Sequence, residues 1–116
     1  MARILSVSYD DTLLRTRELL LEGRGHRVVS CLGFTKALDQ SAKQGFDMLV
    51  VGHSIPAGDK ARIIDRFREY NPMAEVFALL RTGEAPLETV DYYLNPGDPV
   101  AFLETIDRIA ERAGNS

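Results

Sequence analysis

Short apolar runs alternate along this chain with longer segments in which apolar residues recur every three or four positions. The short runs are four or five residues long and mostly valine, isoleucine, leucine or aromatic, which is typical of buried strands. The longer segments have the spacing of amphipathic helices, with one apolar stripe on an otherwise polar surface. The pattern predicts strands at 4–7, 28–31, 48–51, 76–80 and 91–94, and helices from 11 or 12 to about 23, at 34–44, at 59–69 and from 99 to 114.

Residues that start and stop helices stand at the ends of several of these segments. Asp98 is a natural N-cap, and Pro99 suits the first helical position because a missing N–H costs nothing there. Gly23 or Gly25 can end the first helix in a left-handed conformation, and Gly45 can end the second. These signals agree with the periodicity and give the predicted helices defined ends.

The order of the elements predicts an α/β fold. Apolar strands that alternate with amphipathic helices imply a parallel sheet covered on both faces. We find no internal repeat, low-complexity segment or linker, so residues 1–116 are expected to form a single domain. The connection at 81–91 is short, because a crossover with a packed helix normally needs about a dozen residues. Pro86 limits it further, so we expect this fourth helix to be missing or stunted, with at most one turn at 86–90.

Composition excludes several kinds of function. The formal net charge of −3 gives no electrostatic attraction to nucleic acid or to an acidic membrane surface. No apolar run is long enough for a transmembrane helix, and the N-terminus lacks the apolar stretch of a signal peptide, so we expect a cytoplasmic location. Cys31 is the single cysteine, which rules out an intrachain disulfide and gives no zinc site; we expect a small buried hydrophobe. We expect no cofactor.

Several short motifs follow one another at a spacing typical of one known family. They are Ile-Leu-x-Val in the first strand, Leu13-Leu14-Arg15, Gly-His-Arg-Val at 25–28, Gly-Phe-Asp-Met-Leu-Val-Val at 45–51, Ile55-Pro56 with Asp59, and Tyr92-Tyr93-Leu94 with Pro96 and Asp98-Pro99. On these residues, essentially the whole chain resembles the receiver domains of bacterial two-component response regulators. The resemblance implies a three-layer, flavodoxin-like domain whose five parallel strands have the order 2-1-3-4-5.

The resemblance also implies a phosphorylation site past the strand ends, and this sequence changes every position of that site. The positions are Ser8 and Tyr9 for the acidic pair that holds Mg²⁺, Gly52 for the phosphoacceptor aspartate, Leu80 and Arg81 for the threonine or serine and its small neighbour, and Asn95 for the lysine. Neutral hydroxyls are poor ligands for Mg²⁺, and glycine has no side chain to attack phosphorus. The five residues Ser8, Tyr9, Gly52, Leu80 and Asn95 therefore predict a vestigial pocket with no phosphoacceptor and no catalytic residue.

Two acidic residues leave an alternative open. Sliding the alignment by two residues would make Asp10 and Asp11 the metal pair. The helix phase and the distance to Gly25 instead favour Asp10 as a peripheral acid and Asp11 as a helix cap. His53 and Ser54 could be imagined as a substitute nucleophilic site, but no oriented base is visible for the serine, so we interpret His53 as packed or solvated.

Three further expectations concern structure around the pocket. Asp59 is expected to cap the third helix. One of Tyr92 and Tyr93 is expected in the core and the other half exposed. The bond between Asn95 and Pro96 is expected to be cis, because the matching bond in receivers typically is.

Intact architecture with altered chemistry favours binding over catalysis. The leading hypothesis is a degenerate receiver, or pseudo-receiver, that acts without phosphorylation as a protein-interaction module in signal transduction and is not an enzyme. The sequence ends soon after the last predicted helix, so we expect output through another signalling protein or through self-association. The alternative is a small-ligand sensor using a neutral crevice lined by Ser8, Tyr9, His53 and Asn95. A conventional phosphorelay receiver using Asp10 and Asp11 is a weaker alternative, and an enzyme is the weakest.

Overall fold

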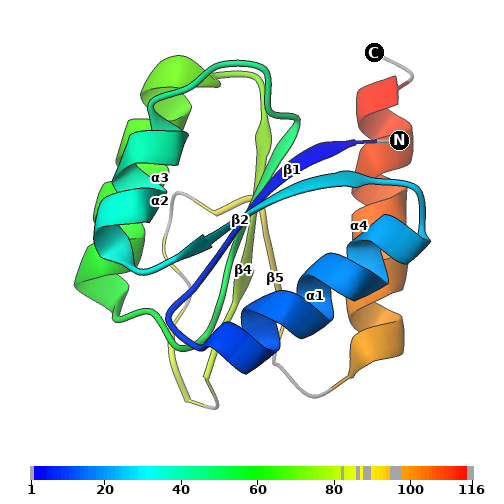
Figure 1. Ribbon diagram of the computed structural model, residues 1–116, viewed down its shortest axis with the longest axis horizontal. Coiled ribbons are helices and arrows are strands. Elements are labelled where there is room, and N and C mark those ends of the chain that lie inside the picture. Colours follow the sequence, from blue (N-terminus) through cyan, green and yellow to red (C-terminus); the bar gives the residue numbers. More distant parts are fainter. Residues whose placement is uncertain (1, 82, 86, 88–89, 95–97, 115–116) are drawn as a thin grey trace.

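Five parallel strands form one sheet in the order β2-β1-β3-β4-β5 (Figure 1). The computed structural model describes residues 2–81, 83–85, 87, 90–94 and 98–114. The strands are β1 (Arg3–Ser8), β2 (Arg27–Leu32), β3 (Met48–Val51), β4 (Glu75–Leu79) and β5 (Tyr92–Leu94). Both the fold class and the strand order are those predicted from the sequence.

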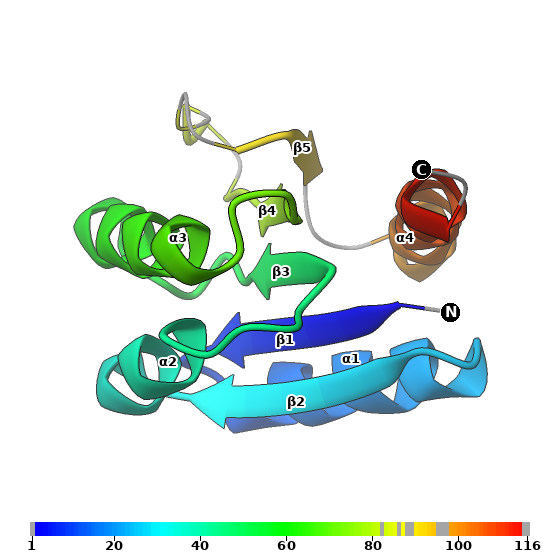
Figure 2. The ribbon, with the colours of Figure 1, turned by 90° about the horizontal axis from the view of Figure 1, so that it is seen from above.

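Helices cover both faces of the sheet and complete three layers. They are α1 (Asp11–Gly23), α2 (Phe34–Ser41), α3 (Ala57–Tyr70) and α4 (Pro99–Gly114). α1 and α4 lie on one face, and α2 and α3 lie on the other (Figure 2). Because successive strand residues point to opposite faces, β3 supplies Leu49 and Val51 to the core under α2 and α3, and Met48 and Val50 to the core under α1 and α4.

The register of the strands brings their carboxyl ends to one edge of the sheet. Val7 in β1 pairs with Val51 in β3, and Val51 pairs with Ala78 in β4. The residues just past these strands are therefore neighbours in space, although they lie far apart in the chain. This edge is where the predicted pocket belongs.

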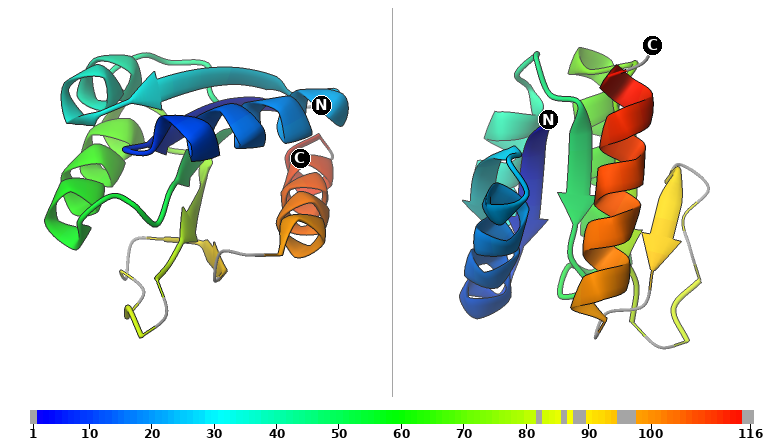
Figure 3. Two further views of the ribbon diagram at one scale, coloured as in Figure 1. Left: turned by 60° about the horizontal axis from the view of Figure 1, so that its bottom comes forward. Right: turned by 90° about the vertical axis from the view of Figure 1, so that its right-hand side faces the viewer.

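The connection between β4 and β5 differs from the other crossovers. The described residues between these strands form no helix, which agrees with the prediction of a missing or stunted fourth crossover helix. Leu87 and Val90 are partly buried and pack against the core that α2 and α3 also cover. The predicted turn at 86–90 falls largely outside the described residues. β5 lies at the edge of the sheet, beside α4 (Figure 3).

Several element ends match the sequence signals. The Asp98 carboxylate accepts a hydrogen bond from the Ala101 N–H at 3.0 Å, as expected for the N-cap of α4. Gly25 directly follows the C-cap of α1 with a φ of +88°, the left-handed conformation in which glycine is favoured. Gly45 has a φ of +95° but lies beyond Ala42, the C-cap of α2, so it does not end that helix as predicted. Cys31 is buried, as predicted, and burial raises the pKa of its thiol to about 11. Tyr92 is partly buried against the core, whereas Tyr93 is 59% exposed.

Other ends correct the predictions. α2 stops at Ser41 rather than at 44, and β4 begins and ends one residue earlier than expected. α3 begins at Ala57, directly after Pro56, so Asp59 lies inside its first turn and is not its cap. The sequence signal at Asp59 misled because its carboxylate has a tertiary partner, described below. No helix among the described residues has the length and apolar character needed to cross a membrane.

Candidate functional site

Four of the five positions of the predicted vestigial pocket meet at the carboxyl edge of the sheet. Ser8 is the buried last residue of β1, and Tyr9 follows it. Gly52 and Leu80 directly follow β3 and β4, and both are buried. The fifth position, Asn95, and its bond to Pro96 lie outside the described residues. The tertiary structure therefore assembles the site that the strand ends predicted, as far as it is described.

A cation from α1 occupies the space beside Gly52. The Nη1 atom of Arg17 lies 2.7 Å from the position that a Cβ at residue 52 would take. Its Nη2 atom lies 3.3 Å from His53 Nδ1, and the whole residue is only 7% exposed. Where the family places a carboxylate, this protein places a guanidinium.

Sequence reasoning missed Arg17, although a signal was present. Arg17 lies on the buried stripe of α1 with Leu14 and Leu21, at spacings of three and four residues. A charged residue in the middle of an apolar helical stripe is unusual, because burying a charge is costly unless something compensates it. Such a residue is a candidate for a role at a site.

Arg17 also changes the electrostatic character that the sequence suggested for the crevice. Burial lowers the pKa of Arg17, and the negative charge of Asp10 partly opposes that effect. A guanidinium nevertheless stays protonated in proteins. The expectation of a neutral crevice is therefore wrong, because a charged side chain from a helix, and not from a strand end, reaches into it.

His53 is held as a neutral imidazole. Burial lowers the pKa of His53, and the positive charges of Arg17, Arg81 and Lys60 lower it further. A guanidinium can only donate hydrogen bonds, so Nδ1 of His53 accepts from Arg17 and the ring proton is on Nε2. His53 therefore packs against a cation, which agrees with its interpretation as a packed residue and not a general base.

The hydroxyl groups at the end of β1 are engaged within the protein. Ser8 Oγ lies 3.2 Å from Ser54 Oγ and accepts the Asp10 N–H at 3.0 Å. Ser54 Oγ also accepts the Tyr9 N–H at 3.0 Å. The Tyr9 hydroxyl donates to Asp59 Oδ2 at 2.9 Å, and burial together with this carboxylate raises the pKa of Tyr9. These contacts tie the end of β1 to the start of α3.

The two acidic residues have roles opposite to those expected. Asp10 is the N-cap of α1, because its Oδ1 accepts the Leu13 N–H at 3.0 Å. Asp11 is the first helical residue and is exposed. The prediction was shifted by one residue, since Ser8 Oγ holds the Asp10 N–H and so sets where the helix begins.

The residues present do not fit the Mg²⁺ that the fold family implies at this edge. The donors at the family positions are neutral hydroxyls that already hydrogen-bond within the protein, as described above. The guanidinium of Arg17 lies against Gly52, where it would repel a divalent cation.

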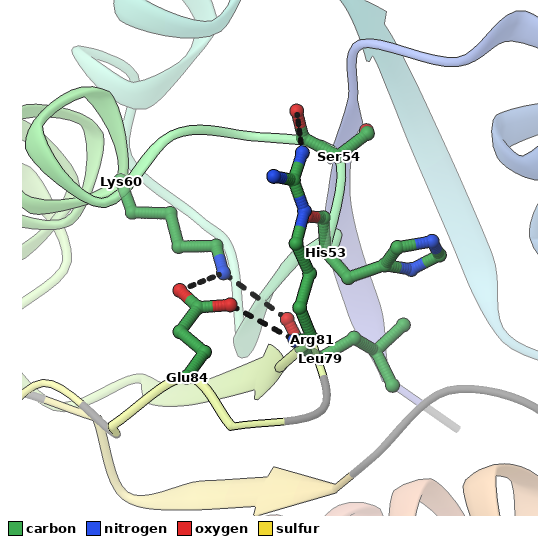
Figure 4. A network of polar contacts seen from close by, with 6 residues as sticks. All are labelled: His53, Ser54, Lys60, Leu79, Arg81 and Glu84. Carbon is green, nitrogen blue, oxygen red and sulfur yellow. Dashed lines mark hydrogen bonds and ion pairs between the residues drawn. The ribbon is translucent and has the colours of Figure 1, made fainter.

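A second buried cation, Lys60 of α3, points toward the end of β4 and the segment that follows it (Figure 4). Lys60 has no exposed surface, and its Nζ donates to the Leu79 carbonyl at 3.2 Å and to Glu84 Oε2 at 3.0 Å. The other carboxylate oxygen of Glu84 accepts the Arg81 N–H at 2.9 Å. Lys60 thus anchors the segment after β4 to α3. Sequence reasoning did not single out Lys60.

Arg81 extends the same network across the crevice. Its Nε donates to the His53 carbonyl at 2.8 Å, and its side chain reaches from the end of β4 toward the loop after β3 (Figure 4). The family places a small residue here, whereas this chain uses a long one to join two loops. Arg81, Lys60 and Glu84 together fix the segment that follows β4.

Comparison with known proteins identifies the fold. No family model and no curated protein matches the sequence. Solved structures do match: a receiver domain protein (CheY-like) from Methanospirillum hungatei JF-1 has 21% identity and a TM-score of 0.81, with 100% of this chain and 99% of that chain covered. The signal receiver domain of an HD domain-containing protein from Pseudomonas fluorescens Pf-5 has 19% identity, a TM-score of 0.80 and coverage of 99% and 98%.

A third similar structure contains a receiver protein with its partner. It is the histidine kinase ThkA in complex with the response regulator protein TrrA, with 15% identity, a TM-score of 0.77 and coverage of 94% of this chain and 98% of that chain. At these identities the likeness concerns the fold. The chain has the fold of response-regulator receiver domains, which the sequence motifs had predicted.

Proposed function

We propose that this protein is a receiver-like signalling module that works without phosphorylation, by binding another signalling protein or a second copy of itself. The observation that carries the proposal is the contact of Arg17 with Gly52, which puts a cation where a phosphoacceptor carboxylate would stand. We expect no enzymatic activity and a cytoplasmic location.

The chemistry of phosphoryl transfer supports this proposal. A receiver needs a nucleophilic carboxylate and a divalent cation that neutralises the transferred group. At this edge, residue 52 has no side chain, and Ser8 and Tyr9 offer hydroxyls already bound to Ser54 and Asp59. The fold is kept, but the atoms that would react are missing from the described residues of the site.

The interaction role is supported by the fold neighbours and by exposed apolar surface. A protein of this fold binds a histidine kinase in the ThkA complex. In this chain, Tyr93 on β5 and Val100 at the start of α4 are 59% and 60% exposed. Apolar side chains exposed close together in sequence and beside a sheet edge are suited to a protein partner.

The proposal is tested with small phosphodonors. The protein is incubated with acetyl phosphate, and separately with beryllofluoride, each with Mg²⁺, beside a phosphorylatable receiver domain as the positive control. We expect an unchanged intact mass and no Mg²⁺-dependent NMR shifts near Gly52. An added phosphoryl group that hydroxylamine removes, as it removes an aspartyl phosphate, or Mg²⁺-dependent shifts near Gly52 would instead favour the weaker alternative, a conventional phosphorelay receiver using Asp10 and Asp11.

The interaction half of the proposal needs its own measurement. Sedimentation at increasing protein concentration reports self-association, and capture from the native cell followed by mass spectrometry reports a partner. Substituting Tyr93→Ser should weaken either association, whereas Glu111→Gln, a change at an exposed position of α4, should not. Association unaffected by Tyr93→Ser would place the partner surface elsewhere.

A further inference from the structure

The guanidinium of Arg17 lacks the hydrogen-bond acceptors that a buried cation requires. Its Nη1 atom is buried and has no partner among the described residues. Within the described part of the chain its one hydrogen bond goes from Nη2 to the neutral nitrogen of His53, at a long 3.3 Å. A guanidinium carries five N–H donors, and buried donors without acceptors are strongly unfavourable. The site is therefore incomplete as a hydrogen-bonding unit.

The carboxylates described above at this edge of the sheet have other partners. Asp59 accepts the Tyr9 hydroxyl, and Glu84 pairs with Lys60. Asp10 is the acid whose charge acts on Arg17, yet its Oδ1 caps α1. No described carboxylate makes a hydrogen bond to the Arg17 guanidinium. The anion that would complete this site is not part of the described chain.

Arg81 adds a second positive charge at the rim of the crevice. It is exposed, and its Nε donates to the carbonyl of His53, the residue that contacts Arg17. Its Nη1 makes no hydrogen bond to the described residues, so donors remain for a ligand. Arg17 contacts the ring of His53 and Arg81 its carbonyl, so the two guanidinium groups give this part of the crevice a positive potential that attracts anions.

We propose that this crevice binds a small doubly charged oxyanion of the phosphate type, held by Arg17 and attracted by Arg81. Charge-assisted hydrogen bonds from a guanidinium to oxyanion oxygens are about twice as strong as bonds between neutral groups, so the anion can replace His53 Nδ1 as the acceptor. The partly exposed ring of His53 turns away as the anion enters. The site uses no metal ion and forms no covalent bond. It extends the proposed function, because the anion would report a metabolic state to the same module.

Titration of the ¹⁵N-labelled protein with inorganic phosphate tests this proposal. Ionic strength is held constant with chloride, and the Arg17 Nε–H resonance and the backbone amides of 52–54 are followed by NMR. We expect saturable shifts at these groups. Arg17→Gln should weaken binding about tenfold or more, and Arg15→Gln, the same change at an exposed position of the same helix, should leave it unchanged.

Substitution of His53 gives a result of opposite sign. His53→Ala removes the partner that competes with the anion, so phosphate should bind more tightly, by several-fold. Backbone NMR spectra of each variant show whether it is folded. Shifts that never saturate, or equal binding by the Arg17→Gln variant, would overturn the proposal, and so would unchanged or weaker binding by His53→Ala.

Three ligands identify the class and the source of the anion. Acetate tests the requirement for two charges, and binding as tight as that of phosphate would contradict it. O-phosphoserine and inorganic phosphate distinguish a phosphorylated metabolite from the free ion, since the crevice must accommodate the organic group only for the first. If none of the three ligands binds, the results of the phosphodonor and association measurements above do not change. The anion site and the proposed signalling function can therefore fail separately.

Discussion

Arg17 Nη1 lies so close to the backbone of Gly52 that a side chain at residue 52 would have to displace the guanidinium. The distance to an ideal Cβ at residue 52 is 2.7 Å, and the Val7 carbonyl oxygen lies 3.2 Å from the same point. Gly52 does not have a positive φ, so a larger residue there is opposed by space and not by backbone strain. The missing acceptor and the buried cation are therefore one feature of the structure.

This relationship predicts that substitutions at the two positions are coupled. Gly52→Ala must displace the guanidinium and should lower the free energy of unfolding by about 1–3 kcal/mol, a typical cost of overpacking. In an Arg17→Met background the same alanine should cost about 1 kcal/mol less. Urea denaturation of the four proteins measures the coupling. Gly58→Ala, where an added Cβ has open space, is the control; equal costs in both backgrounds would contradict the assigned contact.

Lys60 and Glu84 should stabilise the segment after β4 as a pair. Lys60→Met removes a fully buried charge and leaves Glu84 without its partner, so the free energy of unfolding should fall by about 2–3 kcal/mol. This expected loss of stability is smaller than for a fully buried ion pair, because the Glu84 side chain is 18% exposed. The double variant with Glu84→Gln should recover part of the loss. Lys36→Met, at an exposed position, should be nearly neutral; a similar loss there would contradict the role of the pair.

The same pair predicts a dependence of stability on pH. Burial alone would raise the pKa of Glu84, but the hydrogen bond from the Arg81 N–H and the hydrogen bond and charge of Lys60 outweigh it, so the pKa lies below its ordinary 4.5. A carboxyl with a lowered pKa in the folded state stabilises it at neutral pH, and this contribution is lost as pH falls below that ordinary value. Glu84→Gln should remove this loss.

Denaturation of both proteins between about pH 7 and 3 measures the difference curve. The wild-type protein and the Glu84→Gln variant must be compared because Glu75 affects the pH dependence of stability with the opposite sign. Burial and the nearby Asp91 raise the pKa of Glu75. If the difference in the free energy of unfolding between the two proteins stays constant over this pH range, Glu84 is not held ionised by its partners.

Asp10 and Asp11 should differ in their effects on stability. Asp10→Ala removes the N-cap of α1 and should cost about 1 kcal/mol or slightly more, since Asp10 also offsets the charge of Arg17. Asp11→Ala removes only a favourable charge in the first helical turn and should cost less than about 0.5 kcal/mol. Thermal unfolding of both variants distinguishes them. A larger loss for Asp11→Ala would restore the original assignment of the cap.

The local pattern of apolar and polar residues was sufficient to predict most of the fold. The apolar runs at β1, β3 and β4 are buried strands because their residues face helices on both sides, and the short connection after β4 has no room for a packed helix. The N-cap Asp98 and Gly25 act within a few residues of their own positions, so the sequence shows them directly. Asp59 was misjudged because its partner, Tyr9, is 50 residues away in the chain.

The sequence by itself determined the order of strands and helices, the positions that meet at the sheet edge and the absence of an acceptor at Gly52, because these depend on local periodicity and on which side chain is present. Only the tertiary structure decided what fills that edge. Arg17 and Lys60 come from helices, and their charges reach the crevice through long side chains whose direction depends on how α1 and α3 pack on the sheet. Packing across the layers, which periodicity does not encode, made the crevice cationic.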